Sequence, residues 1–279
     1  MALALAFGLI LIANVGAADD PKEIVLKIAN FPPPPRSAPA GKTLKAISSS
    51  KNDITDVDEW FVRNDLALSP YRKTPSHPIA QIGSAARTFR GYTLIEAYAG
   101  PGGMSMIYGD VDGGRFVVVA DATTGVAKTI VDAHAWTKPP KIKPGDAPYV
   151  GMGIRWAVAT DDVLYVSNFH RTYASSSGGF NAYVSAIDLS DGKVLWRSAA
   201  LVANATNFVI VGDAIISGYG FTAEPDYVFV LDRLSGKVRA RVPVKSGPEY
   251  LILKDETLYV RCYDTDYVFA IAGGLKKTP

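Results

Sequence analysis

The chain has 279 residues, of which 48% are hydrophobic and 20% charged, so it can bury a substantial core and is not a disordered polymer. Its formal net charge is only +2 and no long run of Lys or Arg occurs, which argues against a nucleic-acid partner. The only cysteine, Cys262, excludes an intramolecular disulfide, a cysteine-rich metal site and CxxC redox chemistry; we expect it to be a buried apolar side chain.

Residues 1–18, MALALAFGLILIANVGAA, form an apolar run that ends in small residues and is followed by Asp19 and Asp20. The run is short for a membrane span and its end suits cleavage, so we predict a signal peptide, with an uncleaved anchor as the alternative. The absence of Lys and Arg before the run departs from the usual pattern. A cleaved signal peptide implies a periplasmic or secreted protein without stable membrane insertion.

Residues 19–91 are predicted to form an N-terminal arm. Its first part, Lys22–Asn30 (KEIVLKIAN), has the apolar content of a strand, and the prolines of FPPPPRSAP after it favour an extended spacer. Farther along, Thr55, Asp58 and the apolar residues around them suit one short helix. The same stretch, with EWFVRND, also suits a degenerate four-stranded unit, and both interpretations stay open.

A turn motif recurs along the rest of the chain. It reads AIDLSDGKVLWR at 186–197, VLDRLSGKVRAR at 230–241 and VADATTGVAKTI at 119–130. Each copy has Asp followed four residues later by Gly, which predicts a tight turn because Asp bonds nearby backbone N–H groups and Gly accepts positive φ. Upstream, an aromatic residue followed by Val aligns in every copy, and it marks a fourth copy without the turn; these residues are Phe116, Tyr183, Tyr227 and Tyr267.

Two further strand-like runs precede each copy, so the repeating unit has four strands, here called A to D. The spacing from Asp188 to Asp232 is 44 residues. Four short antiparallel strands at this period are typical of a β-propeller blade. We therefore predict an all-β fold with a propeller domain at 92–279 and about four recognisable blades; a β-sandwich is the alternative. Three arrangements are then open. The ring is small, or it is incomplete and a partner completes it, or the segment before Tyr92 supplies a degenerate blade.

The fourth copy stops after its C strand, with GGLKKTP at 273–279. An unpaired strand edge invites aggregation and is usually covered. We predict that Glu23–Ala29 supplies the missing strand by pairing with this last blade; a loose arm is the alternative.

The motif AIDLSDGKVLWR resembles the repeat of propellers related to pyrroloquinoline quinone (PQQ) dehydrogenases. The resemblance extends over about 92–273 and is carried best by the second copy, through Ala186, Asp188, Gly192, Lys193 and Trp196. It implies that Trp196 docks one blade on the next, whereas the third copy has Ala240 at that place. The superfamily also holds non-enzymatic members, including the propeller lipoprotein of the outer-membrane assembly machine. The resemblance implies that its enzymes hold the quinone under a vicinal cysteine pair or an equivalent residue set, with Ca²⁺ bound by carboxylate and amide oxygens; this chain cannot form the cysteine pair.

The connections of each unit differ in length between its two ends. The A-to-B and C-to-D turns are tight, whereas the B-to-C and D-to-A connections hold the long loops 136–153, 168–182 and 218–226. Long loops on one face of a rigid scaffold usually carry function, so we predict the binding face there.

Candidate site residues lie on this face. The ligand-binding candidates are Trp136, His170, Arg171, Tyr173 and Tyr219. The candidates for a Ca²⁺ site or for acid–base chemistry are the pairs Asp110 and Asp112, Glu224 and Asp226, and Asp264 and Asp266. Asp also favours solvated turns, which is the simpler interpretation of these pairs.

We expect an exported, non-enzymatic propeller that recognises a protein or small ligand on its long-loop face and needs no cofactor. The alternative is an enzyme: a divergent PQQ-dependent dehydrogenase, with Ca²⁺ or PQQ as cofactor, or a propeller carbohydrate hydrolase or lyase.

Overall fold

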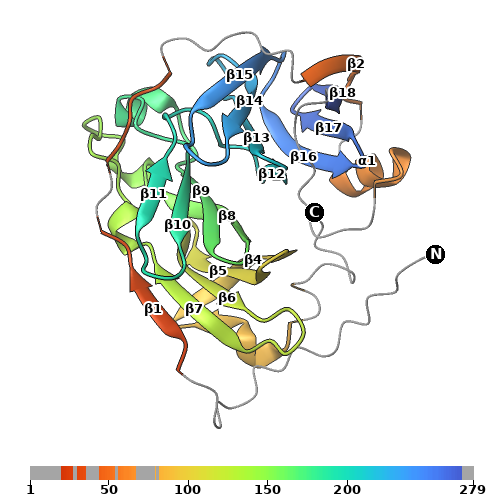
Figure 1. Cartoon of the computed structure of the whole chain (residues 1–279). Helices are drawn as coiled ribbons and strands as arrows, with labels where there is room; N and C mark the ends of the chain where they lie inside the picture. Colours follow the sequence, from red (N-terminus) through yellow and green to blue (C-terminus); the bar gives the residue numbers. More distant parts are fainter. Residues whose placement is uncertain are drawn as a thin grey trace, which may run out of the picture.

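The computed structural model describes residues 20–27, 30–35, 44–53, 56–66, 79 and 82–271. Its strands are arranged in four antiparallel four-stranded units, of which the first two are joined into one larger sheet by a single bridge between Gly114 and Ile154; Figure 1 shows the arrangement. Unit 1 comprises β4 (Tyr92–Gly100), β5 (Gly103–Asp110), β6 (Gly113–Ala120) and β7 (Ala127–Asp132). Unit 2 comprises β8 (Gly153–Ala159), β9 (Val163–Phe169), β10 (Tyr183–Asp188) and β11 (Val194–Arg197). Unit 3 comprises β12 (Val209–Val211), β13 (Ala214–Tyr219), β14 (Tyr227–Asp232) and β15 (Val238–Pro243).

Unit 4 is assembled from both ends of the described chain. It comprises β16 (Pro248–Lys254), β17 (Thr257–Cys262), β18 (Thr265–Ile271) and, as its outer strand, β2 (Leu44–Lys51). In register, Leu44 pairs with Ile271 and Lys51 with Thr265. The all-β propeller architecture predicted from the repeat is confirmed, and the missing fourth strand is supplied from the N-terminal side.

The prediction that Glu23–Ala29 supplies that strand is wrong. β1 (Lys22–Val25) pairs in parallel with β7 of unit 1, not with unit 4, while Ile28 and Ala29 lie outside the described residues. The two segments differ in where their apolar side chains can be buried. Ile24 is buried between units 1 and 2, whereas β2 needs little apolar content because only Leu44 of its eight residues is buried.

The predicted Asp–Gly turns have the expected geometry. In unit 1, Oδ1 of Asp121 accepts hydrogen bonds from the N–H groups of Thr123 (2.9 Å) and Thr124 (3.0 Å). The glycines that end these turns, Gly125, Gly192 and Gly236, have φ of 71°, 78° and 68°. The turns are therefore structural elements that close each C–D hairpin.

The stretch left open between a helix and a degenerate unit is a helix, α1 (Val57–Arg63). Its N-cap is Asp56, whose side chain accepts from the N–H of Asp58. The buried Trp60 and Phe61 of α1 pack with Ile252 against the outward side of unit 4. The remaining short elements are β3 (Thr88–Phe89) and the 3₁₀ turns η1 (Ser84–Ala86), η2 (His134–Trp136), η3 (Ala147–Tyr149) and η4 (Ala174–Ser177).

The core is divided among the junctions between units. Separate clusters of buried apolar side chains join unit 1 to unit 2, unit 2 to unit 3, and unit 3 to unit 4. Among the described residues, no such cluster joins unit 4 to unit 1. Instead, Ile82 and Ala86 pack on the free side of unit 1, and α1 packs on the free side of unit 4. The four described units therefore form an arc whose two ends are covered by segments that precede Tyr92.

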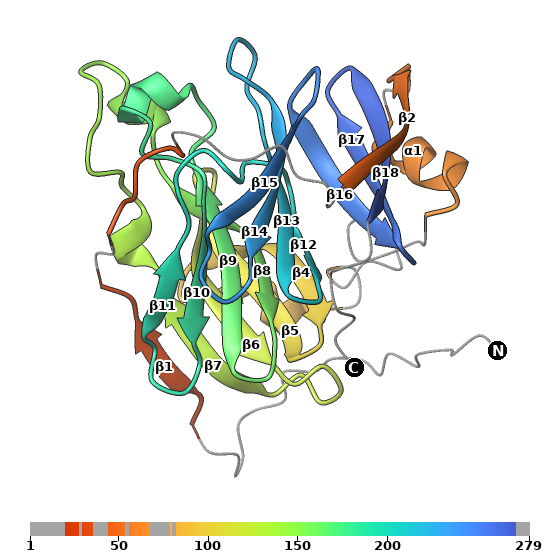
Figure 2. The same ribbon diagram turned by 45° about the horizontal axis from the view of Figure 1, so that its top comes forward.

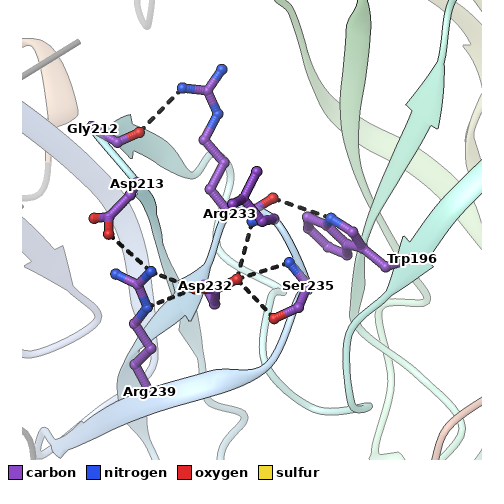
Figure 3. A network of polar contacts seen from close by, with 8 residues as sticks. Trp196, Gly212, Asp213, Asp232, Arg233, Ser235 and Arg239 are labelled. Atoms are coloured by element: carbon purple, nitrogen blue, oxygen red, sulfur yellow. Dashed lines mark hydrogen bonds and ion pairs between the residues drawn. The ribbon is translucent and has the colours of Figure 1, made fainter. Parts of the chain in front are cut away.

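Trp196 joins unit 2 to unit 3, as the resemblance implies (Figure 3). Its Nε1 donates to the carbonyl oxygen of Arg233 at 3.1 Å, and its ring lies so close to Gly236 that a Cβ there would overlap it. Cys262 is buried as expected, and burial raises the pKa of its thiol. Of the helices within the described ranges, none has the length and apolar character that a membrane crossing needs.

Candidate functional site

A cavity of about 1520 Å³ is lined by residues from all four units. It lies at the ends of the strands where the B-to-C and D-to-A connections gather, opposite the tight turns; Figure 2 shows these connections at the top and the tight turns at the bottom. The charged residues of the wall include Asp110, Arg155, Arg171, Asp226, Glu249 and Asp264. The cavity thus lies on the face that the loop lengths indicate.

Arg155 and Arg171 bring two positive charges to the unit 2 side of this wall. Arg155 is half-buried on β8, and its Cζ lies 5.3 Å from the ring centroid of Phe169. Its Nη2 donates to the carbonyl oxygen of Asp112, whereas its Nε is buried without a hydrogen-bond partner. Burial, together with the charge of Arg171, lowers the pKa of Arg155 to about 10. Among the described residues, Arg155 forms no ion pair.

Asp226 and Asp264 bring negative charge to the cavity from units 3 and 4. Oδ1 of Asp226 is buried without a hydrogen-bond partner, and it lies so close to Gly220 that a Cβ there would overlap it. Burial raises the pKa of Asp226, and the neighbouring Asp264 and Glu224 raise it further. Lys245 and Arg261 line the same part of the wall, so charges of both signs face this side of the cavity.

His170 lines the cavity, but its polar atoms bond within its own loop. Its backbone N–H donates to Oδ1 of Asn181 (2.8 Å), and its Nε2 lies 2.8 Å from Oγ of Ser177. Burial lowers the pKa of His170 to about 4, so the ring is neutral near pH 7. Ser177 is completely buried and closed to a substrate, so this Ser–His contact holds the loop together.

The other predicted ligand-binding residues pack outside the cavity wall. Trp136 is buried and donates from Nε1 to the carbonyl oxygen of Lys27 (2.9 Å), and its ring centroid lies 4.0 Å from Cζ of Arg197. The hydroxyl of the buried Tyr219 donates to Glu224, and the ring of Tyr173 meets Phe221 edge to face at 5.0 Å. In the structure, these three side chains make packing contacts within the protein. Their role in ligand binding stays a prediction from the sequence.

The three acidic pairs are split by the fold. Asp110 lines the cavity, whereas the N–H of Asp112 donates to Oδ1 of Asp110 in a local turn. Glu224 accepts from the N–H of Ala174 (2.6 Å), and Asp266 lies in a separate, smaller hollow beside Trp60. Within the described ranges, no three His, Cys, Asp or Glu side chains gather closely enough to hold a metal ion. The Ca²⁺ site remains a prediction without a ligand cluster.

The residues do not fit the quinone site of the enzymes that the turn motif resembles. One cysteine cannot form a vicinal pair, Cys262 is buried in the packing of units 3 and 4, and the carboxylates supply no three-ligand set within the described ranges.

Sequence reasoning missed the charged cavity residues that lie within strands. Arg155 in GIRWAVA, Glu96 in YTLIEAY and Arg261 in TLYVRC each interrupt an otherwise apolar stretch. A charged side chain in a buried strand needs a partner or a solvated cavity, so these interruptions of the apolar pattern could have indicated residues that line a cavity.

No family model and no curated protein matches the sequence. The computationally designed Ika4 protein is similar in structure at 18% identity and a TM-score of 0.36, over 60% of this chain and 86% of its own. BamB from Moraxella catarrhalis is similar at 15% identity and 0.32, over 60% and 55%. A europium-containing methanol dehydrogenase is similar at 13% identity and 0.36, over 60% and 37%. At such identities and scores the likeness carries nothing about activity.

Proposed function

We propose that this protein is an exported binding protein, rather than an enzyme, and that its cavity receives part of a protein partner. The observation that carries the proposal is the cavity of about 1520 Å³ to which all four units contribute. Pockets for small molecules are commonly smaller, roughly 300–1,000 Å³. A cavity of this size suits a loop or an extended peptide segment better.

The enzymatic alternative has less support. The buried Ser177 is inaccessible, and the acidic pairs are divided between the cavity and other surroundings. Export is part of the proposal and rests on residues 1–18, which lie outside the described residues.

The test is selection of binders from a displayed library of random 12-residue peptides. Selected peptides should bind the wild-type protein and lose binding to Thr206→Trp, because the new ring fills part of the cavity to which Thr206 contributes. Ser190→Trp, an exposed position at a tight turn on the opposite face, is the matched control and should bind normally. Peptides that bind both variants equally, or no selected peptide at all, would contradict the proposal.

A further inference from the structure

A proline-rich segment of the N-terminal arm lies against unit 2. Residues 31–35 (FPPPP) follow β1 along the chain and run beside β11, as Figures 1 and 2 show. Each residue from Phe31 to Pro34 precedes a proline, which favours an extended backbone, and a polyproline II segment makes no hydrogen bonds within itself. The carbonyl groups of the segment are therefore free to accept hydrogen bonds from the surface beneath it.

Unit 2 meets this segment with two hydrogen-bond donors. The hydroxyl of Tyr183 donates to the carbonyl oxygen of Pro32 at 3.2 Å, and the N–H of Ala200 donates to that of Pro33 at 3.4 Å. The ring of the next proline lies close to Gly179, where a Cβ would come 3.3 Å from the proline Cγ. The contacts thus follow the segment over three successive prolines.

Aromatic rings and one arginine complete the site. The ring of Phe31 meets that of Tyr183 edge to face at 5.8 Å and packs with the buried Met152. Cζ of Arg197 lies 4.9 Å from the ring centroid of Phe31 and 4.0 Å from that of Trp136. Surfaces lined by aromatic side chains are what several kinds of protein module use to recognise polyproline II segments. The proline site consists of residues that do not line the cavity: Trp136, Met152, Gly179, Tyr183, Arg197 and Ala200.

The segment is held less firmly than β1, which precedes it. None of the five side chains at 31–35 is buried and Pro33 is exposed, whereas Ile24 and Leu26 are only 5% and 3% exposed. Covering Arg197 also has a cost, because its Nη1 and Nη2 are buried without hydrogen-bond partners, and burial lowers its pKa to about 10. Segments with few buried contacts open locally, so residues 31–35 can leave the site while β1 stays docked.

Unit 3 contains the same Tyr–Arg contact in a more open form. Tyr227 and Arg241 occupy the positions of Tyr183 and Arg197 in the repeat. Cζ of Arg241 lies 4.7 Å from the ring centroid of Tyr227, and both residues are half-buried, whereas Tyr183 is completely buried. The contact therefore forms in a unit whose tyrosine keeps part of its surface open, and complete burial of the tyrosine is not needed to build it.

We propose that the proline site recognises proline-rich segments, and that residues 31–35 are its built-in ligand, which a proline-rich segment of a partner protein displaces. Any polyproline II segment presents the carbonyl groups to which Tyr183 and Ala200 donate. An aromatic residue before the prolines adds the contacts that Phe31 makes with Tyr183 and Arg197. The site is separate from the cavity and does not depend on the function proposed for it.

The test measures binding of the labelled peptide NFPPPPRS, residues 30–37, to the full chain by fluorescence anisotropy. A released variant combines Phe31→Gly, Pro32→Ser, Pro33→Gly, Pro34→Ser and Pro35→Gly. The peptide should bind this variant at least about tenfold more tightly than the wild type, because a tethered segment competes at an effective concentration on the order of millimolar. A control peptide with glycine in place of the four prolines should bind neither protein.

Two tyrosine substitutions in the released variant test the contact with the site. Tyr183→Phe removes the donor to the carbonyl of the bound segment and should weaken peptide binding about three- to tenfold. Tyr227→Phe, at the same position of unit 3, is the matched control and should leave binding unchanged. Thr206→Trp should also leave it unchanged, since Thr206 lines the cavity. Equal effects of Tyr183→Phe and Tyr227→Phe, or loss of binding in Thr206→Trp, would overturn the proposal.

A milder variant keeps the test decisive. Phe31→Ala, at a half-buried position, weakens only the built-in ligand and should bind the peptide at least about threefold more tightly than the wild type. Thermal melting checks that each variant folds, and Phe31→Ala decides where the released variant does not. Equal affinities of the wild type and Phe31→Ala, or no binding at all, would overturn the proposal. A wild type that dimerises in sedimentation, beside a monomeric Phe31→Ala, would make a second copy the occupant and overturn it too.

Discussion

Ile24 of the N-terminal arm packs on Gly192 of unit 2, in the way that Trp196 packs on Gly236 of unit 3. A Cβ at Gly192 would lie 2.7 Å from Cγ2 of Ile24. Lys22 completes the parallel, because its Nζ donates to the carbonyl oxygen of Leu189 (3.2 Å), which is the residue after the turn Asp, as Arg233 is in unit 3. Unit 1 has no Trp at the place of Trp196, and β1 takes over its contact.

Ile24→Ala should therefore weaken the junction of units 1 and 2. The side chain is buried, and removing a buried Ile side chain typically lowers the free energy of unfolding by about 2–4 kcal/mol. Urea denaturation measures the change. Val25→Ala, at a side chain that is 70% exposed, is the control and should change stability by less than about 0.5 kcal/mol. Equal effects of the two variants would mean that β1 does not dock there.

Gly236→Ala tests the Trp196 contact separately from backbone strain. Gly236 has φ of 68°, and Gly91 has a similar φ of 83° but no neighbouring atom within 4 Å of the place where a Cβ would lie. Alanine should cost about 1 kcal/mol at both positions because of the positive φ, and about 1–3 kcal/mol more at Gly236 because the Trp196 ring must move. If thermal melting shows that alanine destabilises the protein equally at Gly236 and at Gly91, the Trp196 ring does not pack on Gly236 as described.

A disulfide tests the outer strand of unit 4. Ser48 lies opposite Val268, so Ser48→Cys with Val268→Cys should oxidise to a disulfide in a Cys262→Ser background. Ser48→Cys with Ile271→Cys is out of register, since Ile271 lies opposite Leu44, and should stay reduced. Thiol counting on the folded protein distinguishes them, and the reverse pattern would contradict the placement of β2.

Stability should fall in acid because of His170. Its pKa is about 4 in the folded protein against an ordinary 6.5, so the unfolded chain takes up a proton first as pH falls. The free energy of unfolding should decrease by about 3 kcal/mol between pH 6.5 and 4 and change no further from this group below pH 4. His170→Gln should lack this component, whereas His134→Gln, an exposed control, should keep it. Identical pH profiles for both variants would rule His170 out.

The sequence predicts most of the strands because the Asp–Gly turns and the aromatic column repeat. It does not predict β2, because LKAISSSK is exposed over seven of eight residues and so carries no alternating apolar pattern. The apolar content of KEIV indicates that Ile24 is buried, but not in which junction. The cavity face follows from loop lengths, whereas Arg155 does not, because it lies inside a strand and loop lengths say nothing of charges there.

Amide hydrogen exchange with and without a selected peptide tests the central claim, that binding occurs in the cavity of the long-loop face. If the peptide binds there, exchange should become slower around Arg155 and at 169–171, 220–226, 245–250 and 261–264. The tight turns at 121–125, 188–192 and 232–236 should exchange unchanged. Slower exchange at those turns, with none around the cavity, would contradict it.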